Sequence, residues 1–146
     1  NASTTRGQIV AILYRLEGSP AAGTARFHDV APTAYYASAV SWASDNGIVN
    51  GYGDGSFRPG QLITREQLAA FLYRYAARKG RDVSQQADLS AFVDAGQIAS
   101  YAVEPLRWAN AMRLVNGVSA DRLAPSGNAT RAQAAAVLSR FAQNVL

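Results

Sequence analysis

The chain has 146 residues, 49% hydrophobic and 16% charged, with no cysteine, which fits a packed domain and excludes disulfides, thiolate metal sites and cysteine nucleophiles. No apolar run approaches the roughly 20 residues that cross a bilayer, so we expect no membrane insertion, and the N-terminus lacks an export signal. The net charge of +4 comes mostly from scattered arginines, which favours separate anion contacts over a nucleic-acid track.

The first predicted element is a helix that follows Thr5. Threonine is a good N-cap, and the glutamine three positions later is a capping-box partner. The same pattern opens two later helices, so the three tetrads are Thr5–Gln8, Thr64–Gln67 and Thr130–Gln133. Each is followed by matching apolar positions and by a matching arginine, which is Arg15, Arg74 or Arg140.

A second matched segment precedes the second and third tetrads. Phe27–Val30 corresponds to Phe92–Ala95, and Trp42 corresponds to Trp108, each pair lying roughly 66 residues apart. The first tetrad lacks this segment. We therefore predict the second half of one repeat at 1–20 and two full repeats at 21–80 and 81–146, packed as one compact domain.

Each full repeat is expected to be a helix, a loop and a second helix. Apolar residues at helical spacing run from Tyr35 to Gly47, where glycine ends the first helix. A glycine-rich loop at 48–60 contains at most a short β-bridge. The predicted fold is all-α, with repeats that bury their apolar faces on one another.

An arginine follows each N-cap, at Arg6, Arg65 and Arg131. A positive charge in the first turn opposes the helix dipole by roughly 0.3–1 kcal/mol, so its recurrence needs a reason. One reason is an anion site that combines free backbone N–H groups with a guanidinium. The alternative is an internal ion pair with Asp29 or Asp94, and the two can hold at different copies.

Aromatic residues give a second set of candidates. Trp42 and Trp108 can fill the core or stack on a sugar ring, whereas Tyr52 and Phe57 in the glycine loop suit the mouth of a groove. The one histidine, His28, has no second histidine or cysteine with which to form a zinc site or a catalytic triad. We therefore predict no cofactor, no metal site and no catalytic residue.

The pattern resembles the S-layer homology domain family. It is carried by Phe27-x-Asp29-Val30, by Trp42-Ala43, by the stretch from Gly47 to Pro59, and by Ile63-Thr64-Arg65-x-Gln67. The third repeat is similar but has Ala120–Leu123 where the second has Asp54–Phe57. The family usually has Ala-Glu after Thr-Arg, and this chain departs from that pattern in all three copies.

The resemblance implies a pseudo-threefold helical bundle whose grooves bind secondary cell-wall polysaccharide, often through a pyruvylated sugar. The module would tether a protein to the bacterial cell surface without catalysis. A pyruvate ketal carries a carboxylate, which agrees with the separate anion argument. The ligand-binding positions carried over are Arg6, Arg65, Arg131, Asp29, Asp94, Trp42, Trp108, Asn50, Gly51, Asn116 and Gly117.

Two other functions compete with polysaccharide binding. A module for self-association or protein interaction would use the same apolar groove edges. A nucleic-acid binder is suggested only by the basic pI of about 9.8, and a steep fall of affinity with salt would be its mark.

Overall fold

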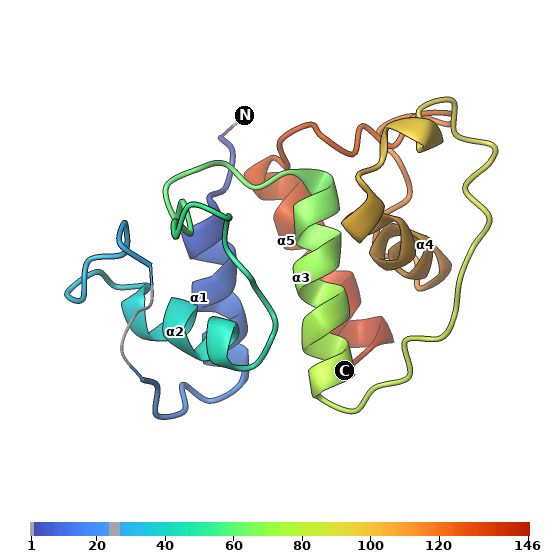
Figure 1. Ribbon diagram of the computed structural model, residues 1–146. Helices are drawn as coiled ribbons and strands as arrows, with labels where there is room; N and C mark the ends of the chain where they lie inside the picture. The colour runs from blue at the N-terminus through green and yellow to red at the C-terminus, as the bar shows by residue number, and fades with distance from the viewer. Residues whose placement is uncertain (1, 24–26) are drawn as a thin grey trace. The chain divides into compact units, whose positions relative to one another are not determined.

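The computed structural model describes residues 2–23 and 27–146, and its regular secondary structure there is helical (Figure 1). The α-helices are α1 (Arg6–Leu16), α2 (Ala37–Asp45), α3 (Arg65–Arg78), α4 (Val103–Ala111) and α5 (Arg131–Asn144), and two 3-10 turns are η1 (Ala95–Gln97) and η2 (Ser100–Ala102). In these ranges β-structure is limited to isolated bridges between loop residues. The predicted all-α repeat fold is confirmed.

The helices α1, α3 and α5 begin with the same capping box. The hydroxyl of Thr5 accepts the N–H of Gln8 at 3.2 Å, and the Gln8 side chain accepts the N–H of Thr5 at 2.9 Å. Thr64 with Gln67 and Thr130 with Gln133 repeat both bonds. Because each box satisfies two otherwise unpaired donors, a cap of this kind stabilises its helix by about 1 kcal/mol.

The helices α2 and α4 lack a side-chain cap and are shorter. Gly47, the predicted terminator of α2, follows the helix with φ of +71°. The corresponding position after α4 is Arg113, which adopts φ of +62°. The third repeat therefore keeps the left-handed helix ending of the second without the residue that adopts it most readily.

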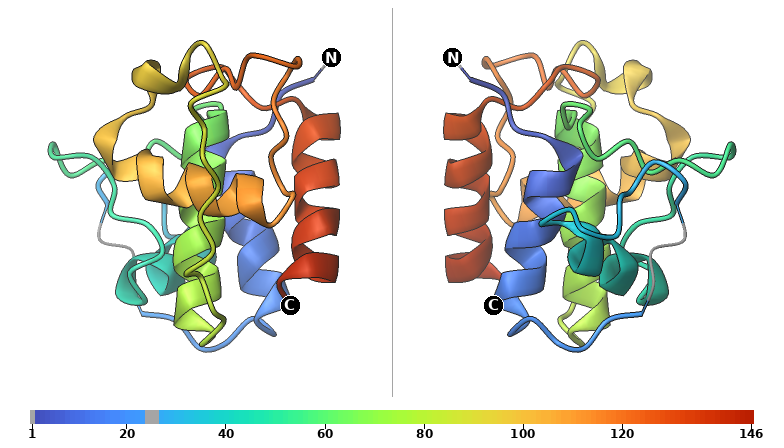
Figure 2. Two further views of the ribbon diagram at one scale, coloured as in Figure 1. Left: turned by 90° about the vertical axis from the view of Figure 1, so that its right-hand side faces the viewer. Right: turned by 90° about the vertical axis from the view of Figure 1, so that its left-hand side faces the viewer.

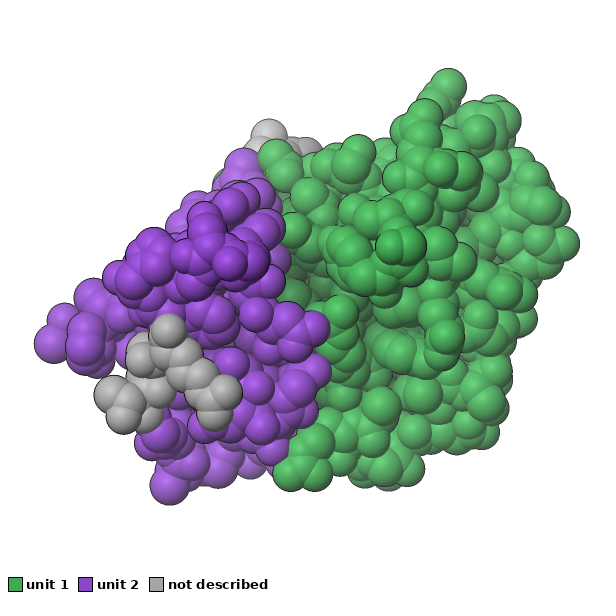
Figure 3. All heavy atoms as spheres, viewed as in Figure 1, with its two compact units in different colours: residues 1–3, 63–146 green, residues 4–62 purple. Residues whose placement is uncertain are grey.

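The chain divides into two compact units (Figure 3). Unit 2 contains residues 4–62, and unit 1 contains residues 1–3 and 63–146. Unit 2 packs α1 against α2, and unit 1 packs α3 against α4. Each unit therefore pairs the second helix of one predicted repeat with the first helix of the next. The units are thus offset by half a repeat from the predicted repeats at 21–80 and 81–146, whose boundaries stay a prediction.

Within unit 1, α4 crosses α3, and α5 points in roughly the same direction as α3 (Figure 2). Three aromatic side chains join these helices. The ring centroids of Trp108 and Phe141 lie 6.4 Å apart, and those of Tyr75 and Phe141 lie 6.0 Å apart. All three side chains are essentially buried, so they form the centre of the unit 1 core.

The three capped helix starts each form the same kind of main-chain bridge. Each capping threonine forms an antiparallel bridge with the residue two positions before another capping threonine. The pairs are Thr5 with Leu62 in unit 2, and Thr64 with Asn128 and Thr130 with Ser3 in unit 1. The repeat thus specifies where the loop meets the helix start, and this is where the candidate arginines lie.

Candidate anion-binding pocket

A pocket of about 210 Å³ lies in unit 1 beside the start of α3, the loop after α4 and one face of α5. Its lining is largely apolar, with guanidinium groups from Arg65 and Arg140. Within the described part of the chain, none of the lining residues is acidic. The lining residues are Arg65, Leu68, Leu114, Val115, Asn116, Gly117, Val118, Leu123, Ala129, Gln133, Ala136, Val137 and Arg140.

Arg65, the first residue of α3, donates three hydrogen bonds, one of them from its Nη1 to the Ala124 carbonyl at 3.4 Å. Its backbone N–H donates to the Gly127 carbonyl at 3.0 Å, and its Nη2 donates to Oε1 of Gln133 at 2.9 Å. A Cβ on Gly127 would lie only 2.3 Å from Nη1 of Arg65. Burial lowers the pKa of the Arg65 guanidinium, but a guanidinium stays charged in proteins. The pocket therefore contains a fixed cation.

Arg140 adds a second positive charge from the far half of α5. Its Nη1 donates to the Leu114 carbonyl at 3.3 Å, which ties the side chain to the loop after α4. The sequence match of Arg140 with Arg15 and Arg74 was a signal for this residue, but the repeat alone did not indicate that it would line the same pocket as Arg65. Gln133 was likewise predicted only as a capping residue.

Asn116 and Gly117 bring the loop backbone to the pocket. Gly117 has φ of +99°, and a Cβ there would lie 2.9 Å from the Phe92 ring. In unit 2, Gly51 has φ of +70° and a Cβ would lie 2.3 Å from the Phe27 ring. Both glycines therefore have a packing reason, because the ring of the Phe-x-Asp segment lies against the loop. Asn50 is exposed at the equivalent point of unit 2.

Asp29 and Asp94 clamp the loops. Asp29 accepts the backbone N–H groups of Phe57 and Arg58 at 2.9 and 2.7 Å. Asp94 accepts those of Leu123 and Ala124 at 2.9 and 2.8 Å. The bond from Leu123 is the main cause that lowers the pKa of Asp94 below its usual value. These bonds give the aspartates a structural role that differs from the predicted ion pair with the helix-start arginines.

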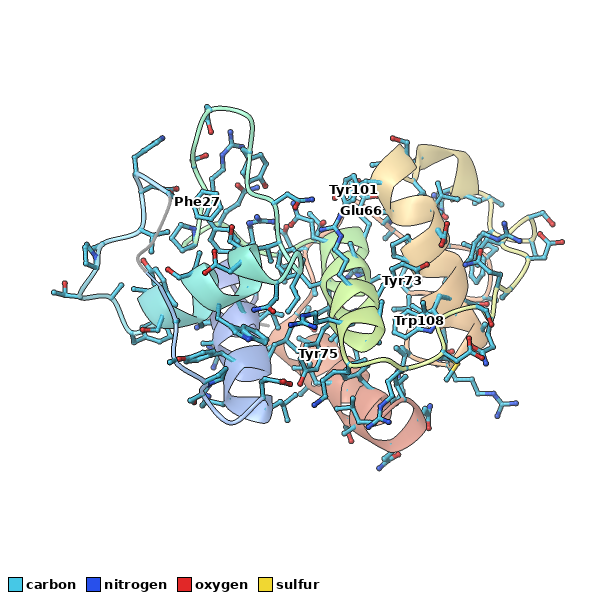
Figure 4. All side chains as sticks on the ribbon, turned by 60° about the horizontal axis from the view of Figure 1, so that its bottom comes forward. Phe27, Glu66, Tyr73, Tyr75, Tyr101 and Trp108 are labelled. Atoms are coloured by element: carbon cyan, nitrogen blue, oxygen red, sulfur yellow. The ribbon has the colours of Figure 1, made fainter. Side chains whose placement is uncertain are left out.

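The two tryptophans are core residues. Trp108 has no exposed surface and makes an edge contact with Tyr73 at 5.5 Å between centroids (Figure 4). Trp42 is 7% exposed and lies 5.6 Å from the Tyr14 ring. Their burial matches the core-packing alternative, and their role in sugar binding stays a prediction. Phe57, expected at a groove mouth, is also fully buried.

The other two helix-start arginines differ from Arg65. Arg6 is 4% exposed, and its Nε donates to the Phe57 carbonyl at 3.0 Å. Arg131 is exposed, and its backbone N–H donates to the Ala2 carbonyl at 2.7 Å. The motif thus yields three environments, which are a pocket wall, a buried side chain and an exposed surface.

In residues 2–23 and 27–146, no group of three or more His, Cys, Asp or Glu side chains is arranged to hold a metal ion. No helix in these ranges is long and apolar enough to span a membrane.

Comparison with known proteins gives a consistent result. The model of the S-layer homology domain matches residues 26–69 and 91–135. The amylopullulanase of Thermoanaerobacterium thermosulfurigenes is 32% identical over 94% of the chain and 7% of its own length. The surface-layer 125 kDa protein of Lysinibacillus sphaericus is 32% identical over 86% and 10%. The cell surface protein of Thermoanaerobacter kivui is 34% identical over 82% and 16%. The chain therefore spans less than a fifth of each of these relatives.

Proposed function

The chain belongs to the S-layer homology domain family, and we propose that it is a cell-wall anchoring module. Its ligand is an acidic saccharide of the bacterial secondary cell-wall polymer, bound in the pocket of unit 1. The module acts by non-covalent binding and catalyses no reaction. As part of a longer secreted protein, it would hold that protein at the cell surface.

The observation that carries this proposal is the charge of the pocket. Arg65 and Arg140 contribute two cations, and the described lining residues include no carboxylate to neutralise them. In a partly buried site a cation attracts an anion more strongly than it does in bulk water. A guanidinium also matches the planar geometry of a carboxylate. An acidic ligand is therefore favoured over a neutral one.

The size and the walls of the pocket limit the rest of the ligand. The volume of about 210 Å³ is smaller than the roughly 300–1,000 Å³ of pockets that enclose drug-sized molecules. One sugar ring with its substituent suits this space better than a stretch of polymer. Leu68, Val118 and Leu123 offer apolar surface to the methyl group of a ketal, and Asn116 offers an amide to ring hydroxyls.

Two matched ligands test the charge argument. One is a monosaccharide with a 4,6-linked pyruvate ketal, and the other is the same sugar with an acetone ketal, in which a methyl group replaces the carboxylate. Isothermal titration calorimetry should detect binding of the first and at least tenfold weaker binding of the second, because a charge-assisted contact contributes about 1.5–3 kcal/mol. Equal affinity for both ketals would contradict the proposal.

Variants locate the binding site. Arg65→Ala and Arg140→Ala should each weaken binding of the pyruvate ketal at least tenfold. Arg81→Ala is the matched control, because it removes an exposed arginine outside the pocket and should leave affinity unchanged. Loss of binding in the control as large as that in the pocket variants would indicate a nonspecific effect of net charge.

Cell-wall sacculi provide the natural form of the ligand. The chain should co-sediment with purified bacterial sacculi and should lose this binding after mild acid removes the non-peptidoglycan polymer with its ketals. The Arg65→Ala variant should fail to sediment with untreated sacculi. Binding that survives acid extraction would place the ligand in peptidoglycan and would contradict the proposed polymer.

A further inference from the structure

Unit 2 contains the counterpart of Arg65, but there the arginine lies inside a stack of side chains. The guanidinium carbon of Arg6 lies 4.6 Å from the centroid of the Phe57 ring and 4.9 Å from that of the Tyr52 ring. The guanidinium carbon of Arg58 lies 3.7 Å from the Tyr52 centroid. Phe57 and Arg6 are buried, Tyr52 is partly exposed, and Arg58 is exposed. Tyr52 and Arg58 thus form the outer layers of the stack.

Arg58 is held in place over Tyr52. Its Nη2 lies 3.4 Å from Oδ2 of Asp54, and its Nε donates to Oγ of Ser56 at 3.3 Å. Hydrogen bonds from Ser56 lower the pKa of Asp54 to about 2, so this carboxylate is charged at neutral pH. Cation–π contacts on Tyr52 from both Arg6 and Arg58 add attraction.

The loop after α2 and the loop after α4 have the same backbone conformation but differ in their side chains. The N–H of Tyr52 donates to the Ser56 carbonyl at 2.8 Å, and the N–H of Val118 donates to the Arg122 carbonyl at 2.8 Å. Arg58 and its counterpart Ala124 both adopt positive φ, at +60° and +49°. Unit 1 therefore has valine and alanine where unit 2 has the covering tyrosine and arginine.

We propose that Tyr52, clamped by Arg58, closes the unit 2 copy of the anion site, so that Arg6 is a latent ligand-binding residue while Arg65 is an open one. The ligand of the latent copy would be the same acidic saccharide, and this part rests on the proposed function. Opening requires the Tyr52 ring to leave its place over Arg6. The two copies in one chain are thereby unequal, although their Thr-Arg-x-Gln tetrads are alike.

Chemical labelling of arginine tests the closure without any saccharide. Phenylglyoxal reacts with accessible guanidinium groups, and mass spectrometry of the peptides gives a rate for each arginine. In the unmodified chain Arg6 should react at least tenfold more slowly than the exposed Arg131. The double variant Tyr52→Val with Arg58→Ala, which installs the unit 1 residues, should raise the Arg6 rate at least tenfold and leave the Arg131 rate unchanged.

Circular dichroism checks that the double variant is folded. If it is not, the single variant Arg58→Ala decides, because it removes only an exposed side chain and should still speed labelling of Arg6. Labelling of Arg6 as fast as Arg131 in the unmodified chain would overturn the closure. Slow labelling of Arg6 in a folded double variant would show that Tyr52 is not the cover, and would overturn it as well.

Titration with the pyruvate ketal tests the latent site. The double variant should bind one more equivalent per chain than the unmodified protein, and adding Arg6→Ala should remove that equivalent. Unchanged stoichiometry in a variant whose Arg6 is readily labelled would overturn the latent-site assignment. If the unmodified chain binds no ketal, the proposed function fails, while the labelling rates still decide whether Tyr52 closes over Arg6.

Discussion

The start of α1 in unit 2 and the start of α3 in unit 1 have the same cap and the same arginine, yet they differ in what surrounds the guanidinium. Arg6 is 4% exposed beneath aromatic rings, whereas Arg65 lines an open pocket. The backbone of the two loops is held by the same aspartate clamp, through Asp29 and Asp94. The comparison teaches that the repeat specifies the position of the arginine, while the side chains of the loop decide whether a ligand can reach it.

A second difference lies one residue further along each helix. In unit 2 a Cβ on Gly7 would lie 3.2 Å from the Tyr36 ring, so the missing side chain makes room for the tyrosine. In unit 1 the corresponding pair is Glu66 and Ala102, and the Glu66 carboxylate accepts the N–H of Ala99 at 3.1 Å. In unit 2 the loop position holds the large residue and the helix position the small one, and in unit 1 the sizes at these positions are reversed.

The largest expected effect separates the two tryptophans. Trp108→Ala should lower the free energy of unfolding by about 3–5 kcal/mol, since it empties a fully buried site. Trp42→Ala should lower the free energy of unfolding by less, because Trp42 is 7% exposed. Guanidinium chloride unfolding measures both. Comparable losses below about 1 kcal/mol would show that the rings do not form the cores of their units.

The next effect concerns the arginines themselves. Arg6→Ala should destabilise the chain by about 2 kcal/mol, because it leaves the buried Phe57 carbonyl without this donor and removes ring contacts. Arg65→Ala should cost less than about 1 kcal/mol, since the partners of Arg65 face a pocket open to water. Thermal unfolding of both variants gives the comparison. A larger loss for Arg65→Ala would mark Arg65 as chiefly structural.

The loop clamps differ in burial and so in expected cost. Asp94 is 3% exposed, and Asp94→Asn should lower the free energy of unfolding at pH 7 by about 2 kcal/mol, because an amide cannot accept both loop N–H bonds as well. Asp29→Asn, at a partly exposed carboxylate, should cost less. Urea unfolding of both variants at pH 7 measures the two costs.

The pH dependence of the Asp94→Asn effect has a definite sign. The pKa of Asp94 is lowered on folding from its ordinary 3.8, so the carboxylate contributes its full stability above about pH 4. That contribution is lost as the pH falls through the folded-state pKa. Unmodified chain and variant should therefore converge in stability in acid, and a difference that stays constant down to pH 2 would exclude the carboxylate as its source.

Local signals in the sequence were sufficient for the helices. Thr5, Thr64 and Thr130 each have the hydroxyl and the glutamine partner of a capping box, and all three boxes are present. Gly47 marked the end of α2 within two residues. The beginning of α2 was predicted two residues early, at Tyr35, because no capping side chain marks its start at Ala37.

The candidate site was less predictable because it depends on contacts between distant segments. Arg65 meets Gln133 and Gly127, more than sixty residues away, and no local pattern reports such a meeting. The burial of Arg6 depends on Tyr52, whose aromatic ring is equally consistent with a groove mouth and a lid. Trp108 recurs in the repeat for packing, and repetition alone does not separate packing from binding.

The smallest effect tests the exchange of sizes between helix and loop. Gly7→Ala should gain helix propensity, but its Cβ would lie 3.1 Å from the Pro59 carbonyl oxygen and 3.2 Å from the Tyr36 ring, so its net effect on stability should be small. In a Tyr36→Ala background the same change should be more favourable by about 0.5–1 kcal/mol, which a double-mutant cycle measures. The control is Ala132→Gly at the matching position of α5, where the side chain is exposed, and its cost should be independent of Tyr36. Strict additivity of Gly7→Ala and Tyr36→Ala would show that the two residues do not constrain each other.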